Sequence, residues 1–272
     1  MDPPRGSFLG YNTNNDFVKI PIRAFETKKL IDASIADIRK LVDSNQLQPG
    51  QFTFLSYLLA RPELSANDVA IIAFSLYADG LNTTVPTFVY NLYLLATNPL
   101  CQKLLHEEIM THAPDETEPL TPTILAKMSY LKACFKEAHR LLPNGTEISR
   151  RLKTDLALGG YHVPAGTEVS ITMNVHFRNP SYFPQPNSFK PERWLRDHPE
   201  SCDRQIPPFL MIPFGHGPRM CAGRRFAEQD IYVLLVRLLR KFEVGYRGGQ
   251  MQQKFMTLLL PEGPTPFTFK LR

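Results

Sequence analysis

The sequence predicts a mainly α-helical fold with a minor β component, with helices first and a small sheet later. Long segments of helical character fill the first half of the chain. Short alternating segments punctuated by glycine and proline begin at residue 150 and return after residue 248. Between them, ten of the 24 prolines lie from Pro164 to Pro218 among aromatic residues. This pattern predicts an ordered but irregular connection.

Composition places the chain among globular proteins. Its 272 residues are 43% hydrophobic, which is enough for a sizeable core. The 31 basic and 26 acidic residues give a net charge of +5, far from a polycation, and we expect no nucleic-acid partner. Disordered, collagen-like and coiled-coil classes do not fit this composition.

The first half of the chain is predicted to be helical. Mixed-charge periodicity predicts a helix over residues 25–45 and a second over 51–60. Ser65 and Asp68 have the spacing of a capping box ahead of a long helix over 67–97.

The long helix is strongly apolar. From residue 69 to 98 its only charged side chain is Asp79. A membrane span is the alternative, but Gly80, Asn82, Thr83 and Thr84 add a polar block near the centre that is costly in lipid. We therefore expect a helix buried on all sides in a globular core.

The rest of the chain alternates between helices and irregular segments. Asn98 is expected to cap a helix whose first residue is Pro99. Further helices are predicted over 129–142 and 222–241, with a polar loop over 111–122. Short strands and hairpins are expected over 150–173, the proline-rich meander over 179–218, and a strand pair over 248–272.

A cysteine at the end of a glycine-rich loop carries the strongest chemical signal. Cys221 directly precedes a predicted helix, where free N–H groups and the helix dipole stabilise a thiolate. Gly217 and Gly223 let the backbone pass close to a flat group, and Arg219 can pair with a carboxylate at its edge. Phe214 can shield the sulfur. A structural cysteine beside a tight turn is the alternative interpretation, but the whole pattern favours a metal-ligating thiolate.

The segment PFGHGPRMCAGRRFAEQDI resembles the haem-binding signature of cytochromes P450. The resemblance implies haem b with Cys221 as the axial thiolate ligand. It also implies a haem-propionate contact from Arg150, for which the neighbouring Arg151 is the alternative. The implied haem-binding set is Phe214, Gly215, Gly217, Arg219, Cys221, Gly223 and Arg150.

Two further motifs resemble the ExxR helix and the following meander motif of that family. Arg140 lies three positions after Glu137, so the two side chains can pair on one helix face. The resemblance adds Arg193, from the PERW segment, to form a buried Glu–Arg–Arg triad that holds the cysteine loop. A pair on a solvated face is the alternative.

The long helix resembles the oxygen-binding helix of the family through Asp79-Gly-Leu-Asn82-Thr83-Thr84. The implied role of Thr83 is to order water and relay protons. Asn82 stands where an acid is usual and cannot relay by ionising, so Asp79 or water must serve, or activity is impaired. The alternative is that both threonines bond back to helix carbonyls. Pro86 frees the carbonyl of Asn82, which predicts a local widening of the helix.

Basic residues near both motifs bear on the electron donor. Lys132 and Lys136, with His139, are expected on one helix face, and Arg224 and Arg225 follow the cysteine. A solvated basic face is the general alternative. The segments resemble the mitochondrial branch, in which such lysines dock an acidic ferredoxin. A flavoprotein reductase, as in the microsomal branch, is the second choice.

The resemblance implies a monooxygenase that inserts one oxygen atom of O₂ into an apolar substrate, either sterol-like or xenobiotic. Chains of the family are longer, so we expect a truncated product, divided into a helical lead-in over 1–64 and a haem-binding core over 65–272. The alternative is an inactive haem-binding or ferredoxin-binding fragment.

The expected location is the matrix side of the mitochondrial inner membrane, or else the endoplasmic reticulum membrane. Residues 1–12 show neither a signal peptide nor a transit helix, and membrane association is expected only through absent segments. No CxxC pair exists, so we expect neither a zinc knuckle nor a thioredoxin-type site. The four scattered cysteines do not form a disulfide scaffold, so we expect a reducing compartment and interpret Cys101, Cys134 and Cys202 as structural thiols. The histidines show no metal-ligand spacing.

Overall fold

The computed structural model describes residues 16–46, 48, 53–202 and 206–272, and it confirms the mainly α class with small antiparallel sheets. The chain divides into two compact units, residues 1–82 and 83–272, with the division inside α3 (Ala66–Thr97). The expected division at residues 64 and 65 stays a prediction. Predictions for residues 1–12 and for Gln51 lie outside the described residues.

The first unit contains α1 (Asp16–Asp43), α2 (Thr53–Leu59) and the start of α3. α1 begins nine residues before the predicted start. The capping box of α3 is confirmed: the Ser65 N–H donates to Asp68 Oδ2 at 2.8 Å, and the Asp68 N–H donates to Ser65 Oγ at 3.2 Å. These two bonds satisfy backbone N–H groups at the start of a long helix.

The helix α3 continues through Pro86 to Thr97 without an interruption in its α-helical assignment. The predicted widening at Asn82 stays a prediction. No helix of the described residues combines the length and apolar character needed to span a membrane.

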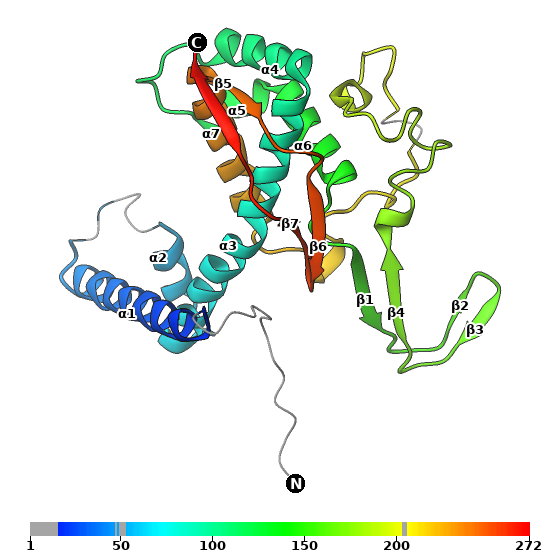
Figure 1. Cartoon of the computed structure of the whole chain (residues 1–272). Helices are drawn as coiled ribbons and strands as arrows, with labels where there is room; N and C mark the ends of the chain where they lie inside the picture. Colours follow the sequence, from blue (N-terminus) through cyan, green and yellow to red (C-terminus); the bar gives the residue numbers. More distant parts are fainter. Residues whose placement is uncertain (1–15, 47, 49–52, 203–205) are drawn as a thin grey trace. The chain divides into compact units, whose positions relative to one another are not determined.

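The second unit contains four further helices around the C-terminal part of α3 (Figure 1). They are α4 (Pro99–His112), α5 (Pro122–Lys127), α6 (Ser129–Leu141) and α7 (Arg224–Lys241). Their apolar faces form one core, in which Leu95, Leu105, Ile109, Leu131, Leu235 and Leu239 have no exposed surface. The sequence does not indicate α5, which lies at the end of the predicted polar loop.

One helix start differs from expectation in its cap, and another is capped by a side chain of a different helix. The Asn98 side chain makes no cap bond to α4; its Nδ2 donates instead to the Leu94 carbonyl at 2.7 Å, at the end of α3. The start of α6 is capped from another helix. Glu108 of α4 accepts from the Tyr130 N–H at 2.7 Å and from the Leu131 N–H at 2.9 Å. This contact ties α4 to α6.

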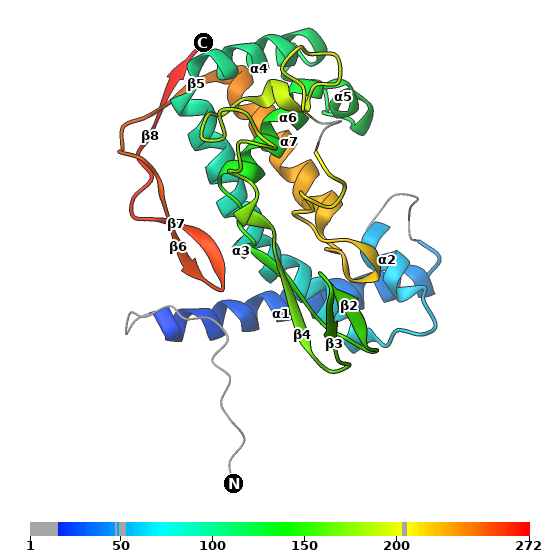
Figure 2. The same cartoon turned by 90° about the vertical axis from the view of Figure 1, so that its right-hand side faces the viewer.

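The strands form four antiparallel pairs. The first two pairs make a long ribbon whose distal hairpin extends away from the helices of the second unit in the view of Figure 1 and points toward the viewer in Figure 2. After α7, the single predicted strand pair is in fact two pairs, and the first begins at once after the helix. The pairs are β1 (Glu147–Arg151) with β4 (Glu168–Thr172), β2 (Leu156–Leu158) with β3 (Tyr161–Val163), β5 (Phe242–Tyr246) with β8 (Phe267–Leu271), and β6 (Gln252–Met256) with β7 (Leu258–Glu262).

The described residues between β4 and α7 form irregular chain, as the prolines predict. Short 3₁₀ turns interrupt it: η1 (Met173–Val175), η2 (Pro191–Trp194) and η3 (Gly217–Arg219). A second apolar cluster of Ala133, Phe183, Trp194 and Cys202 anchors this meander to α6.

Candidate haem-binding site and its buried support

Glu137 of α6 is the centre of a buried charge cluster. Its Oε1 accepts bonds from Arg140 Nη2 at 2.7 Å, from the Lys190 N–H at 3.0 Å and from Arg193 Nε at 3.2 Å. Its Oε2 accepts from Arg140 Nε and from the indole Nε1 of Trp194, both at 2.9 Å. Glu137 is fully buried, so these five donors replace the water that the carboxylate loses.

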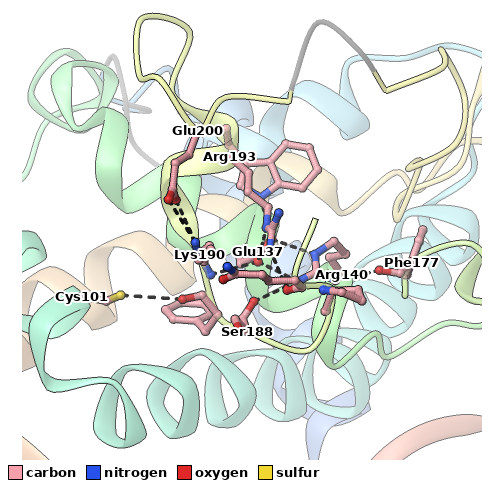
Figure 3. Close-up of polar contacts among 12 residues, drawn as sticks. Cys101, Glu137, Arg140, Phe177, Ser188, Lys190, Arg193 and Glu200 are labelled. Carbon is pink, nitrogen blue, oxygen red and sulfur yellow. Dashed lines mark hydrogen bonds and ion pairs between the residues drawn. The ribbon is translucent and has the colours of Figure 1, made fainter. Parts of the chain in front are cut away.

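The two arginines of this cluster also donate hydrogen bonds to backbone carbonyls of the meander (Figure 3). Arg140 Nη1 donates to the carbonyls of Phe177 at 2.7 Å and Pro186 at 2.6 Å, and its Nη2 donates to that of Ser188 at 3.2 Å. Arg193 Nη2 donates to the Gln185 carbonyl at 2.8 Å. The structure thus brings together all three residues of the predicted triad and uses them to fix chain far away in sequence.

The triad has the features of a structural rather than a reactive centre. The Arg140 and Glu137 side chains have no exposed surface, and Arg193 is 3% exposed. A buried ion pair stabilises a fold only when its remaining hydrogen-bonding groups are also satisfied. Here carbonyls of the meander satisfy both guanidinium groups. Removal of one member would leave an uncompensated buried charge.

Trp194 is a member of this cluster that motif spacing does not reveal. It is the chain's one tryptophan and lies immediately after Arg193. The side chain is 9% exposed, and its N–H donates to the Glu137 carboxylate 57 residues away in sequence. The signal in the sequence is only general: a buried indole N–H usually has a hydrogen-bond partner.

The cysteine loop leads directly into α7. The Cys221 N–H donates to the Phe214 carbonyl at 2.8 Å, which closes the loop across η3. Gly215 and Gly217 have φ angles of 74° and 77°, a region that favours glycine. The Cys221 side chain is exposed at the surface of the unit. The loop therefore holds the backbone beside the sulfur and leaves the sulfur accessible.

An aromatic cluster packs the loop onto α6. The Phe214 ring stacks on Phe135 with centroids 6.3 Å apart and lies 5.5 Å from the His139 ring. The Arg224 guanidinium also lies 5.5 Å from the Phe214 centroid. Phe214, whose carbonyl accepts the bond from the Cys221 N–H, is thus held between α6 and the first turn of α7.

The other three cysteines differ from Cys221 in their surroundings. Cys134 and Cys202 are buried, Cys101 is half-buried, and all four are free thiols. Burial raises the pKa of Cys101 and of Cys202, and it raises the pKa of Cys134 well above its usual range. These three sites disfavour a thiolate, in agreement with the structural role predicted for them.

The surroundings of Cys221 fit a large flat group that needs one protein ligand. Met220 and Phe226 expose 43% and 52% of their surface, so apolar surface adjoins the cysteine loop. A Cβ on Gly217 would meet nothing within 4 Å. Arg150 and Arg219 are exposed, and within the described ranges neither forms an ion pair with a carboxylate. Both are therefore available to pair with acidic groups of a ligand.

The predicted catalytic residues lie on α3. Asp79 and Asn82 are exposed and belong to the first unit, whereas Thr83 is half-buried and belongs to the second. The Asn82 amide donates to the Ala78 carbonyl at 3.2 Å. The Thr83 carbonyl accepts from Thr87 Oγ1 at 2.8 Å, one residue after Pro86, which has no N–H to donate.

The predicted basic face requires one correction. Lys132 is half-exposed, and Lys136, Arg224 and Arg225 are exposed. His139, expected beside the lysines, is buried with 7% exposure, and its Nδ1 lies 3.0 Å from the Phe135 carbonyl oxygen. Burial lowers the pKa of His139. His139 therefore belongs to the buried aromatic cluster and not to the solvated face of α6.

The sequence profile of the cytochrome P450 family matches residues 14–269. Probable cytochrome P450 CYP44 of Caenorhabditis elegans is 42% identical over 246 residues, which cover 90% of this chain and 46% of that protein. Cytochrome P450 302a1, mitochondrial, of Drosophila melanogaster is 35% identical over 81% of this chain and 45% of that protein. Probable cytochrome P450 49a1 of the same fly is 38% identical over 75% of this chain and 35% of that protein.

The chain belongs to the cytochrome P450 family. The family match covers most of its length and confirms the resemblance that the motifs indicated. Several relatives carry mitochondrial names, as the interpretation of the basic residues anticipates. The chain spans less than half the length of these relatives. Cytochromes P450 are in general haem monooxygenases with a cysteine thiolate ligand, and among the described residues Cys221 is the one cysteine that is exposed.

Proposed function

We propose that this chain is the haem-binding part of a monooxygenase that inserts one oxygen atom of O₂ into an apolar substrate, sterol-like or xenobiotic. The observation that carries the proposal is the exposed Cys221 sulfur on a loop fixed by the bond from its N–H to Phe214. Cys221 would hold the iron of haem b. Bound haem with a thiolate ligand supplies the O–O cleavage and oxygen-insertion chemistry.

The residues around the sulfur have binding roles in this proposal. Phe214, Gly215, Gly217 and Gly223 shape the loop so that the porphyrin face can approach the backbone. Arg219 and Arg150 pair with the haem carboxylates, because both guanidinium groups are exposed and can form charge-assisted hydrogen bonds to a carboxylate. The Glu137–Arg140–Arg193 triad fixes the meander that leads to the loop.

Proton delivery is assigned to α3. The Thr83 hydroxyl holds and passes a proton, and Asp79 is the nearest ionisable residue of the motif, one helical turn before it. Asn82 orders water but cannot ionise.

Electrons come from an acidic ferredoxin in this proposal. Lys132, Lys136, Arg224 and Arg225 place basic side chains at or near the surface of α6 and of the first turn of α7, where Arg224 also pairs with Glu228 at 2.9 Å. The location that matches such an electron donor is the matrix side of the mitochondrial inner membrane. A flavoprotein reductase at the endoplasmic reticulum is the second choice.

A second candidate function is a catalytically inactive haem-binding or ferredoxin-binding fragment. Asn82 favours it, because the amide stands where the family motif has an acid and bonds back to the Ala78 carbonyl. A carboxamide does not ionise and therefore contributes no acidic proton to the relay.

Turnover separates the two candidates. The haem-loaded chain would be mixed with ferredoxin, ferredoxin reductase, NADPH and ¹⁸O₂, and sterol and xenobiotic substrates would be followed by mass spectrometry. The monooxygenase predicts a product with one ¹⁸O atom, less of it in Thr83→Ala, and more product per NADPH in Asn82→Asp. Haem binding and ferredoxin binding without any labelled product, in wild type and in Asn82→Asp, would contradict the enzyme and support the fragment.

A further inference from the structure

We propose that Phe209 is a positioning residue of the cysteine loop: its ring holds His216, and the loop thereby keeps Cys221 in place for the haem iron. The inference rests on the proposed function, since Cys221 is the iron ligand proposed above. It assigns a role to an exposed aromatic side chain that lies outside the motifs of the sequence.

Phe209 occupies a backbone position that disfavours its own side chain. The Leu210 N–H donates to the Pro207 carbonyl at 3.1 Å, which defines a four-residue turn with Pro208 and Phe209 at its centre. Phe209 has a φ of 70°. A turn with proline second and a positive φ third is of type II, which prefers glycine or asparagine at the third position. A phenylalanine there is strained, so the turn itself does not explain this residue.

Core packing does not explain the phenylalanine either. Phe209 exposes 60% of its surface. Its neighbours Ile206, Leu210 and Met211, by contrast, pack against the apolar cluster that contains Trp194. These neighbours anchor the chain on both sides of the turn, and a strained conformation persists only where its surroundings fix it. The structure therefore maintains an unfavourable conformation that presents a phenylalanine ring at the surface.

The presented ring contacts the cysteine loop. The ring centroids of Phe209 and His216 lie 4.9 Å apart, and the ring planes meet at 76°, the edge-to-face arrangement that aromatic pairs prefer. Among the described residues, neither ring has another aromatic neighbour, and His216 is itself exposed. The pair therefore joins two surface segments, the turn over residues 207–210 and the cysteine loop.

His216 has the one side chain at the most adaptable point of the loop. It stands between Gly215 and Gly217, whose φ angles are 74° and 77°. Glycine permits such angles but does not fix them. On one side Phe214 is held by the aromatic cluster of α6, and on the other side the chain enters α7. The contact from His216 to Phe209 restrains the stretch between these two anchors.

Restraint of the loop before haem binds lowers the cost of binding. A mobile loop loses conformational entropy when its cysteine is fixed to a ligand. The contact between Phe209 and His216 removes part of this loss in advance. Removal of the ring should therefore loosen the loop and weaken haem binding, although neither residue belongs to the proposed haem-binding set.

Three variants separate the ring from the backbone strain. Phe209→Tyr keeps the ring, Phe209→Ala removes the ring and keeps a side chain at positive φ, and Phe209→Gly removes both. Denaturant titration of the haem-free chain should give Phe209→Gly an unfolding equilibrium constant about fourfold smaller than that of Phe209→Ala. Both variants should nevertheless show the same loss at the loop. A merely structural role predicts instead that the more stable variant also holds the loop better.

Two readouts report on the loop. In the haem-free chain, hydrogen exchange of the Cys221 amide, which is bonded to the Phe214 carbonyl, should be about threefold faster in Phe209→Ala and Phe209→Gly than in wild type and Phe209→Tyr. The dissociation constant from spectroscopic titration with ferric haem should rise about threefold in the same two variants. Phe255→Ala is the matched control, because Phe255 is 65% exposed on β6, and it should change neither readout.

A double variant identifies the contact. His216→Ala should reproduce both losses, and Phe209→Ala combined with His216→Ala should lose no more than either change alone. Additive losses, or unchanged amide exchange in Phe209→Ala, would overturn the positioning role. Wild type that takes up no haem would overturn the proposed function and this role with it, whereas equal haem affinity in wild type and Phe209→Ala would overturn the positioning role alone.

Discussion

The buried cluster around Glu137 and the loop around Cys221 differ in how far the protein itself satisfies their side chains. Glu137 has no exposed surface, and the protein itself supplies every one of its five hydrogen-bond donors. Cys221 is exposed, and its backbone N–H is tied down. The first region is complete as a piece of protein, whereas the second leaves its cysteine exposed. The difference separates residues that hold the fold from the residue that we propose as the cofactor ligand.

The largest expected effect on stability comes from a substitution in the buried cluster. Glu137→Ala leaves two buried guanidinium groups without their carboxylate, and we expect a loss of about 3–5 kcal/mol in the free energy of unfolding. Denaturant titration of the purified chain measures it. Glu147→Ala, at an exposed position of β1, is the control and should change stability by no more than about 0.5 kcal/mol. Equal effects of the two changes would show that the triad is not the structural centre.

A smaller effect is expected in the loop backbone. Gly217 has a φ of 77°, and a Cβ added there would meet no atom within 4 Å, so Gly217→Ala should cost about 1–2 kcal/mol through backbone strain alone. Gly145→Ala is a matched control, because its site is equally open and lacks a positive φ. Denaturant titration that finds the same stability for both variants would contradict the role assigned to the loop conformation.

The buried His139 connects the two regions and predicts a pH dependence. Burial lowers its pKa in the folded chain, so the unfolded chain binds the proton more tightly. Stability should therefore fall as the pH drops from about 6.5, the usual histidine value, toward the lower native pKa, with at most the slope of one proton. His139→Leu should flatten this part of the stability profile, measured by denaturant titration at several pH values. An unchanged profile would place the acid sensitivity elsewhere.

The smallest effect on stability is expected at the cysteine itself. Cys221→Ala should change the free energy of unfolding of the haem-free chain by no more than about 0.5 kcal/mol, because the side chain is exposed. Cys134→Ala, at a fully buried site, should cost about 1 kcal/mol or more. A larger loss of unfolding free energy in Cys221→Ala than in Cys134→Ala would mean that the Cys221 sulfur contributes to core packing.

Local patterns in the sequence predict the helices well. They predict less well the contacts between residues that are far apart in the sequence. The capping box of Ser65 and Asp68 and the helical span of α3 follow from neighbours in sequence. α1 begins nine residues before the predicted start, and Pro21 lies inside the helix. The β5 strand follows α7 without a turn signal and pairs with β8 near the end of the chain, so no local pattern reveals it.

The candidate site shows the same division. Cys221 and the Glu137–Arg140 pair can be predicted because motif spacing and helix geometry are local. The partners of those residues cannot: Trp194 reaches Glu137 across 57 residues, and His139 packs against the Phe214 ring of the cysteine loop. A charge pattern on one helix cannot show which side chains a distant loop will cover.

The most direct test of the central claim is haem binding followed by the spectrum of the reduced, CO-treated chain. We expect uptake of one haem and a thiolate-type Soret band in wild type and in Cys101→Ala, and loss of that band in Cys221→Ala. A wild-type chain that takes up no haem, or a thiolate-type band that survives Cys221→Ala, would contradict the account.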